Sequence, residues 1–124
     1  MFNKCILIGR LTADPELKKA GETSVTNFTL AVDRPFKNNK GEKETDFVRI
    51  VVFGKQAENV SEYLKKGRLA TVEGRLQIRS YEDKEGAKKY VSEIIANNVI
   101  FMPDGKNGTP NIEIEEVEDD YVPF

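Results

Sequence analysis

The chain has 124 residues, of which 39% are hydrophobic, 19 are Lys or Arg and 21 are Asp or Glu. This length and composition predict one domain with a hydrophobic core and little chain left over for a second. No apolar run comes near the roughly 18 residues that span a bilayer, and no secretory signal is evident at the start. We therefore expect a cytoplasmic protein.

The side chains that carry most enzyme chemistry are scarce. The chain has no histidine and one cysteine, Cys5. The commonest general acid or base and every Ser–His or Cys–His pair are therefore missing, and little is left for a zinc site or an internal disulfide. We predict no catalytic residue, metal ligand or cofactor, although carboxylate–metal catalysis remains formally open. Cys5 is expected to be a small apolar residue on a strand.

Acidic and basic residues are unevenly distributed along the chain, whose net charge is −2 at pH 7. Residues 1–102 hold 18 of the 19 Lys and Arg and 14 of the 21 Asp and Glu, whereas residues 103–124 hold one Lys and seven acids. A mildly basic body followed by a strongly acidic end indicates a different partner for each segment.

Five segments have the composition or the alternation of β-strands. They cover residues 3–11, 24–34, 45–53, 69–81 and 89–102. Turn residues separate them at Asp14-Pro15, at residues 20–22, in the polar hairpin of residues 35–44, and at residues 83–86. Gly9 suggests a bend or bulge in the first strand.

One helix is predicted between the third and fourth strands, over residues 56–66. Its apolar face consists of Ala57, Val60, Ser61 and Leu64. Lys65 and Lys66 form a basic last turn before Gly67, and no Ser, Thr or Asp caps the start. Five strands with one short helix in this place predict an all-β OB-fold, a partly open five-stranded barrel.

Two of the predicted strands combine an aliphatic face with an opposite face of aromatics and arginines. In residues 45–53 the core-like set is Asp46, Val48, Ile50 and Val52, and the opposite set is Thr45, Phe47, Arg49, Val51 and Phe53. In residues 70–81 the core-like set is Ala70, Val72, Gly74, Leu76 and Ile78, and the opposite set is Thr71, Glu73, Arg75, Gln77, Arg79 and Tyr81. Flat rings beside cations are typical of surfaces that bind single-stranded nucleic acid.

The predicted hairpin repeats this chemistry in Arg34-Pro35-Phe36-Lys37, and Lys55 follows Phe53 by two residues. The spacing alone leaves an alternative open. Phe47 and Phe53 could pack under a loop or in a subunit contact, with the arginines as ordinary surface residues.

The C-terminal segment, residues 113–124, is acidic and ends in Tyr121-Val122-Pro123-Phe124. Residues 103–112 before it have the composition of a linker, and charge repulsion predicts that the acidic tail is disordered in isolation. A tail that served only solubility would have no reason to end in four apolar or aromatic residues. We therefore expect it to dock on a partner with a basic, partly hydrophobic pocket.

These residues together resemble the bacterial single-stranded DNA-binding protein family, whose members are chromosomal, plasmid or phage encoded. The motifs are Asn3-Lys4-Cys5-Ile6-Leu7-Ile8-Gly9-Arg10-Leu11, Asp14-Pro15-Glu16, Phe28-Thr29-Leu30-Ala31, Asp46-Phe47-Val48-Arg49-Ile50-Val51-Val52-Phe53-Gly54-Lys55, Tyr63-Leu64-Lys65-Lys66-Gly67 and Val72-Glu73-Gly74-Arg75-Leu76. The closing Asp119-Asp120-Tyr121-Val122-Pro123-Phe124 is similar to the acidic Pro-Phe tip of that family.

The resemblance implies an OB-fold domain over residues 1–102, a short linker over 103–112 and a protein-interaction tail over 113–124. It implies a homotetramer in the cytoplasm, associated with the nucleoid, that binds single-stranded DNA during replication, recombination and repair. The base-stacking residues would be Phe36, Phe47, Phe53 and Tyr81, and the phosphate contacts Lys4, Arg49, Lys55 and Arg79. Arg75 joins the phosphate contacts on face geometry, and Arg34 and Lys37 join them as the cations that flank Phe36. Partner enzymes would bind Asp119, Asp120, Val122, Pro123 and Phe124.

The sequence departs from that family in three ways. It has no Trp, which many members use for stacking; its linker is short; and Tyr121 and Val122 stand where the tip usually has Asp and Ile. Two other classes of function remain as alternatives: an adaptor that uses the aromatic face for a protein partner, and a metal-dependent nuclease.

Overall fold

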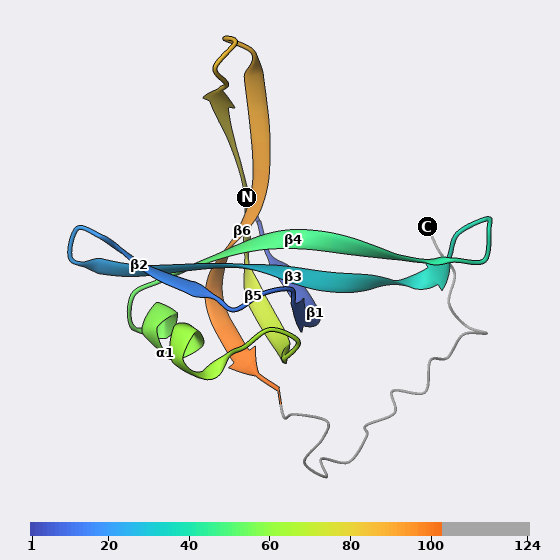
Figure 1. Cartoon of the computed structure of the whole chain (residues 1–124), viewed down its shortest axis with the longest axis horizontal. Coiled ribbons are helices and arrows are strands. Elements are labelled where there is room, and N and C mark those ends of the chain that lie inside the picture. Colours follow the sequence, from blue (N-terminus) through green and yellow to red (C-terminus); the bar gives the residue numbers. More distant parts are fainter. Residues whose placement is uncertain (103–124) are drawn as a thin grey trace.

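The computed structural model describes residues 1–102, which form six strands and one helix (Figure 1). The elements are β1 (Cys5–Leu11), β2 (Glu16–Ala20), β3 (Thr23–Lys37), β4 (Lys43–Phe53), α1 (Lys55–Tyr63), β5 (Leu69–Glu82) and β6 (Lys88–Phe101). The predicted linker and acidic tail lie outside the described residues. In this part of the chain no helix is both long and apolar enough to cross a membrane.

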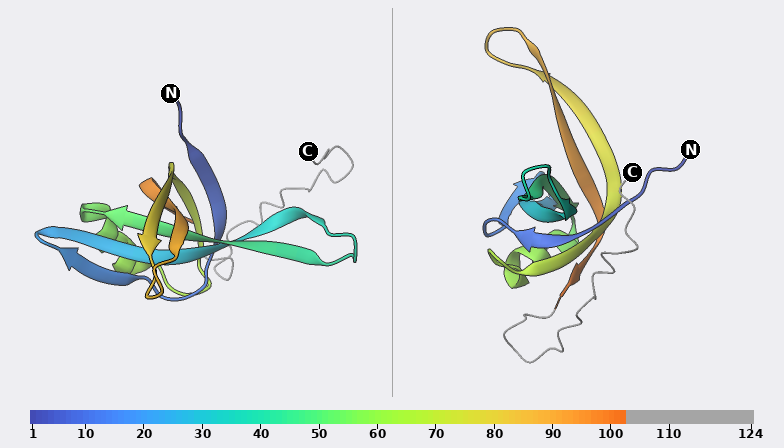
Figure 2. Two further views of the ribbon diagram at one scale, coloured as in Figure 1. Left: turned by 90° about the horizontal axis from the view of Figure 1, so that it is seen from above. Right: turned by 90° about the vertical axis from the view of Figure 1, so that its right-hand side faces the viewer.

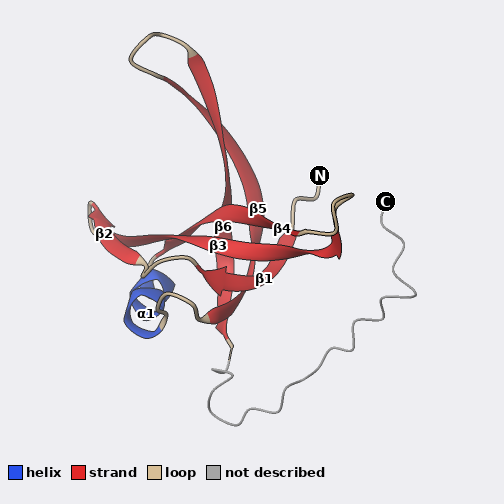
Figure 3. Ribbon diagram, turned by 45° about the vertical axis from the view of Figure 1, so that its right-hand side comes forward, coloured by secondary structure: helices blue, strands red, loops and turns tan. Residues whose placement is uncertain are grey.

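The strands form one sheet in the order β1-β5-β6-β4-β3-β2, and a further pairing between β1 and β3 closes it into a barrel. All pairings are antiparallel except the short parallel ladder between β4 and β6, in which Arg49 lies opposite Glu93. The helix lies between β4 and β5 in the chain and packs on the barrel away from the β5–β6 hairpin (Figure 3). The predicted OB-fold is confirmed.

The barrel closes next to Gly9, at Arg10, where β1 changes its neighbour from β5 to β3. Residues 5–10 of β1 pair with β5, and Arg10 and Leu11 pair with β3. A Cβ atom at Gly9 would lie 2.4 Å from the carbonyl oxygen of Ala31, so only glycine allows the two backbones to approach this closely. The β1–β5 ladder runs through Gly9 without a register shift, so no bulge lies there. Gly9 instead lies where β1 passes close to β3, one residue before Arg10, which pairs with both β5 and β3.

The core lies inside this barrel and beneath the helix. Its buried residues are Leu11, Phe28, Leu30, Ile50, Val52, Ala57, Val60, Leu64, Ala70, Val72, Ile94 and Val99. The alternation predicted for residues 24–34 is followed closely, because Phe28 and Leu30 are buried while their chain neighbours are partly exposed. Burial of each large apolar side chain contributes about 1.5–3 kcal/mol, so this set dominates the stability of the fold.

The strand β2 was not predicted from the sequence. Its five residues are all exposed, so they show no alternation of apolar and polar side chains. The strand forms because Gly21, with a φ of +66°, turns the chain so that Ala20 pairs with Thr23 and Glu16 with Asn27. Backbone hydrogen bonds to β3 therefore define β2, and the pattern of side chains in β2 does not.

The helix ends earlier than predicted, at Tyr63 instead of Lys66. Leu64 is in an extended conformation and fully buried, so the chain leaves the helix in order to place this side chain in the core. Lys65 and Lys66 are consequently not a last helical turn. The backbone N–H of Lys66 donates to Asp14 Oδ1 at 2.8 Å, which ties this turn to the segment after β1.

Two hairpins extend from the barrel as arms that point in different directions (Figures 1 and 2). The β3–β4 arm includes much of the hairpin predicted as residues 35–44, because both strands continue past their predicted ends to Lys37 and Lys43. In the β5–β6 arm the expected core positions Leu76 and Ile78 are 40% and 61% exposed. That expectation was wrong, because β5 continues beyond the barrel and no other described element covers this side of it.

Candidate nucleic-acid interface

Strand pairing brings the two predicted aromatic and arginine faces onto one side of the sheet. The strand β6 lies between β4 and β5, and its Glu93 is opposite both Arg49 of β4 and Gln77 of β5. Paired residues in a ladder point to the same side of the sheet, and so do residues two apart in one strand. The resulting surface, here named the arginine–aromatic face, consists of Phe47, Arg49 and Phe53 of β4 and Arg75, Arg79 and Tyr81 of β5.

The rings of this face are accessible. Phe47 is 68% exposed, Phe53 49% and Tyr81 47%, whereas Ile50 and Val52 on the opposite side of β4 are buried. Within residues 1–102, therefore, no loop covers Phe47 or Phe53. A contact with a second copy of the chain is the part of the alternative interpretation that stays open.

Two of the arginines are held by one buried carboxylate. Glu93 is 4% exposed, and it accepts a hydrogen bond of 3.0 Å at Oε1 from Arg79 Nε. Its Oε2 lies 3.5 Å from Arg49 Nε. Both arginine side chains remain about half exposed. Glu93 therefore fixes each of them while part of the side chain stays open to solvent. Arg75 is held differently, because its Nη1 donates to Gln77 Oε1 at 2.9 Å.

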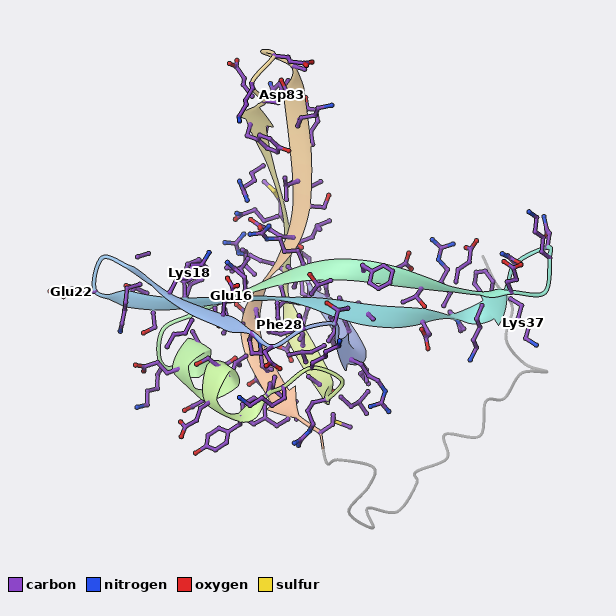
Figure 4. All side chains as sticks on the ribbon, in the orientation of Figure 1. Glu16, Lys18, Glu22, Phe28, Lys37 and Asp83 are labelled. Carbon is purple, nitrogen blue, oxygen red and sulfur yellow. The ribbon has the colours of Figure 1, made fainter. Side chains whose placement is uncertain are left out.

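The carboxylate lies where the two arms separate. The parallel ladder joins β4 and β6 only from Arg49 to Val51 and from Glu93 to Ile95. Beyond it, β4 continues into the arm on which Figure 4 labels Lys37, and the β5–β6 hairpin rises to the tip at Asp83. The arginine–aromatic face therefore spans the junction of the arms and part of each.

Four other predicted contacts lie around this face and not within it. Phe36 and Lys37 are at the far end of the β3–β4 arm, and Lys55 begins α1 just after Phe53. Lys4 precedes β1, and its Nζ lies 3.1 Å from Glu73 on β5. All four side chains are on exposed residues. The structure thus gathers six of the predicted residues and distributes these four along the surface beside them.

Arg34 differs from the others because two carboxylates engage all three nitrogens of its guanidinium. Its Nη2 lies 2.9 Å from Asp46 Oδ1, its Nε donates to Oδ2 of the same carboxylate at 3.1 Å, and Nη1 contacts Glu44. The hydrogen bond from Arg34 lowers the pKa of Asp46, and the same bond with the charges of both acids raises the pKa of Arg34. A DNA phosphate would have to compete with two carboxylates for this guanidinium.

Sequence reasoning did not single out Glu93 or its role. Alternation along residues 89–102 places Glu93 on the same side as Lys89 and Val91, which is the available signal. Its partners are set by the β4–β6 and β5–β6 registers, which join residues far apart in the sequence. No group of three or more His, Cys, Asp or Glu side chains among residues 1–102 is arranged to hold a metal ion.

Comparison with known proteins gives consistent matches. A relative in Staphylococcus aureus strain Mu50, Single-stranded DNA-binding protein 1, is 55% identical over 111 residues, which are 88% of this chain and 71% of the relative. Single-stranded DNA-binding protein 2 of Staphylococcus aureus strain COL is 52% identical over the whole of both chains. The solved structure described as Plasmodium falciparum SSB complex with ssDNA has a TM-score of 0.75 and 32% identity, and the match covers 83% of this chain and 96% of that one.

The family described as "Single-strand binding protein family" matches this chain over residues 2–102, which include every element of the barrel and both arms. The conclusion from this match and from the two relatives is that the chain belongs to the single-strand binding protein family.

Proposed function

We propose that this protein binds single-stranded DNA without sequence specificity and protects it during replication, recombination and repair, acting as a binding protein and not as an enzyme. The observation that carries the proposal is the exposed arginine–aromatic face over an otherwise aliphatic barrel. Unpaired bases present flat faces that stack on rings, at about 1–3 kcal/mol per base, and every nucleotide brings a phosphate. Neither interaction depends on base identity, so the binding tolerates any sequence.

The roles follow from residue type and position. Phe47, Phe53 and Tyr81 stack bases, and Phe36 adds a ring on the β3–β4 arm. Arg49, Arg75 and Arg79 contact phosphates between these rings, with a wider set of cations at Lys4, Arg34, Lys37 and Lys55. The relatives named as single-stranded DNA-binding proteins, and the matching structure described as a complex with ssDNA, support this assignment.

The division of the chain supports a second role, the recruitment of partner enzymes. Residues 1–102 would bind DNA, residues 103–112 would act as a linker, and residues 113–124 would dock replication, recombination and repair proteins. Docking would use the C-terminal tip, Asp119, Asp120, Val122, Pro123 and Phe124. The opposite net charges of the two ends support this separation of roles, because an acidic tail is unsuited to DNA and suited to a basic pocket. A protein with both roles would act in the cytoplasm, at the nucleoid.

Self-association into a homotetramer is the third part of the proposal. Ile8 on β1, Thr71 on β5 and Ile100 on β6 lie in one row across the sheet, and Ile6 lies beside them. The three isoleucines are exposed, and among the described strands none pairs with the outer edge of β1 over residues 5–9. An apolar patch beside an open strand edge favours contact with another copy. The number of four comes from the resemblance described above.

The experiment that tests DNA binding is a titration of the full chain with labelled oligo-dT, duplex DNA and single-stranded RNA at two salt concentrations. We expect tight binding to oligo-dT that weakens as salt rises, and weak binding to duplex. Equal affinity for duplex and oligo-dT would overturn the proposal. Capture of partner proteins without any DNA affinity would favour the adaptor alternative, and DNA cleavage with Mg²⁺ would favour the nuclease. Light scattering tests the tetramer.

A further inference from the structure

The arginine–aromatic face contains a buried acid at its centre, which is unexpected in a surface that binds a polyanion. Glu93 is one of three polar or charged residues that are buried among residues 1–102, and it is the only one of the three that carries a charge. It lies between β4 and β5 and reaches a guanidinium from each. A buried carboxylate is costly unless cations and hydrogen bonds compensate it, so these two contacts explain how Glu93 is tolerated.

The geometry of the contacts determines what remains available to a ligand. Both arginines face Glu93 through Nε, at 3.5 Å for Arg49 and 3.0 Å for Arg79. Within the described chain, the Nη atoms of these two guanidiniums have no hydrogen-bond partner. Both side chains are about half exposed, so their unpaired Nη atoms are available to contact a phosphate.

We infer that Glu93 is a positioning residue for DNA binding: it fixes Arg49 and Arg79 by their Nε sides so that their Nη edges face the DNA backbone, and its charge cancels one of their two positive charges. This inference rests on the proposed function. It means that the junction of the arms presents two oriented donors with a net charge of one, and that the DNA affinity depends less on salt than two free arginines would make it.

Two substitutions separate orientation from charge. Glu93→Gln removes the charge and leaves one acceptor oxygen, because the amide nitrogen is a donor and repels the second guanidinium. One arginine is then released as an uncompensated cation. Glu93→Asp keeps the charge but is one methylene shorter, so it cannot hold both Nε atoms at their present distances. The matched control is Glu62→Gln, which removes the same charge from an exposed residue of α1.

The assay is fluorescence anisotropy with labelled oligo-dT and the full chain, from about 50 to about 200 mM NaCl. For Glu93→Gln we expect a steeper dependence of log affinity on log salt, by about 0.7 for one additional uncompensated positive charge that neutralises a phosphate. Between the two ends of this salt range, the ratio of the variant's affinity to the parent's should therefore change about 2.5-fold. For Glu93→Asp we expect weaker binding at every salt concentration with the parental slope. Glu62→Gln should follow the parent.

Parental slope for Glu93→Gln, or parental affinity for Glu93→Asp, would overturn the inference. Thermal unfolding of each variant shows that the molecules compared are folded. A residue that only stabilised the fold would lower the melting temperature and leave both the slope and the affinity of the folded molecules unchanged. If the parent itself does not bind oligo-dT, the proposed function fails, and that result is distinct from failure of the role given to Glu93.

Discussion

Replacement of Phe47 by Ala tests the stacking role of the arginine–aromatic face most directly, because this ring contributes little to the fold. Phe47 is 68% exposed, so only about a third of its surface is removed from water. A buried aromatic side chain hides roughly 200 Å², and a third of that at about 25 cal/mol per Å² is about 1.7 kcal/mol. A domain with about 5–15 kcal/mol of net stability remains folded after such a loss.

The effect on DNA binding should be larger. Loss of one stacked base costs about 1–3 kcal/mol of binding free energy, which corresponds to a dissociation constant about 5- to 150-fold higher. Because the ring carries no charge, the slope of log affinity against log salt should stay parental while the whole line shifts. Anisotropy titrations with oligo-dT over a range of salt measure both quantities, and urea unfolding measures the stability.

A matched control is Tyr63→Ala, which removes an exposed aromatic side chain from α1, on a different part of the molecule. Tyr63 packs against Phe101 at a ring separation of 6.1 Å, so its loss should affect stability slightly and DNA affinity not at all. The reasoning is refuted if Phe47→Ala binds oligo-dT as the parent does, or if it unfolds. Unfolding would mean that the ring is structural, and unchanged binding would mean that DNA follows another surface.

Three further predictions concern other parts of the chain. Truncation after Asn111 should raise oligo-dT affinity at low salt, because the acidic tail would no longer compete for the basic body; unchanged affinity in the same titration would exclude this competition. Gly74→Ala should destabilise the fold by about 1–3 kcal/mol in urea unfolding, because its Cβ would lie 2.2 Å from the Ile95 carbonyl oxygen, and an unchanged midpoint would contradict this. Asp46 should titrate below its ordinary pKa of about 3.9 by NMR, so its ion pair persists above that pH and is lost as the pH falls through the lowered value. Arg34→Ala should return the midpoint to the ordinary range, and a midpoint that does not move would show that Arg34 is not the cause.

The sequence predicted the parts of the fold in which local pattern and burial agree. Phe28 and Leu30 alternate with polar residues because one side of β3 faces the core. The exposed positions of Phe47 and Arg49 followed from the same period of two. The same period was wrong for Val51, which is buried, and for Asp46, which is exposed. Gly41 and Gly86 have φ angles of +77° and +82° at the two predicted hairpin tips, where composition alone is a strong signal.

Prediction from the sequence failed where the structure depends on contacts between distant segments or on backbone hydrogen bonds alone. The strand β2 has no buried side, so no pattern marks it. Leu64 appeared helical by spacing, but the core position that it fills requires extended backbone. Leu76 and Ile78 alternate as core residues do, but they are exposed because β5 extends beyond the barrel. The contacts of Glu93 with Arg49 and Arg79 depend on two strand registers, which local sequence does not determine.

The separation of core and arms has a consequence for local unfolding. The buried cluster ends at the barrel, so residues 33–37 and 75–82 are held mainly by ladder hydrogen bonds and surface pairs. We expect the amide protons of such segments to exchange through local opening at low free energy, and those of Leu30 and Ile50 to exchange only through global unfolding. Most of the proposed DNA contacts lie on the arms or at their base. When single-stranded DNA binds, amide hydrogen exchange should therefore slow in the arms, while the exchange rates of the slowest amides of the barrel barely change.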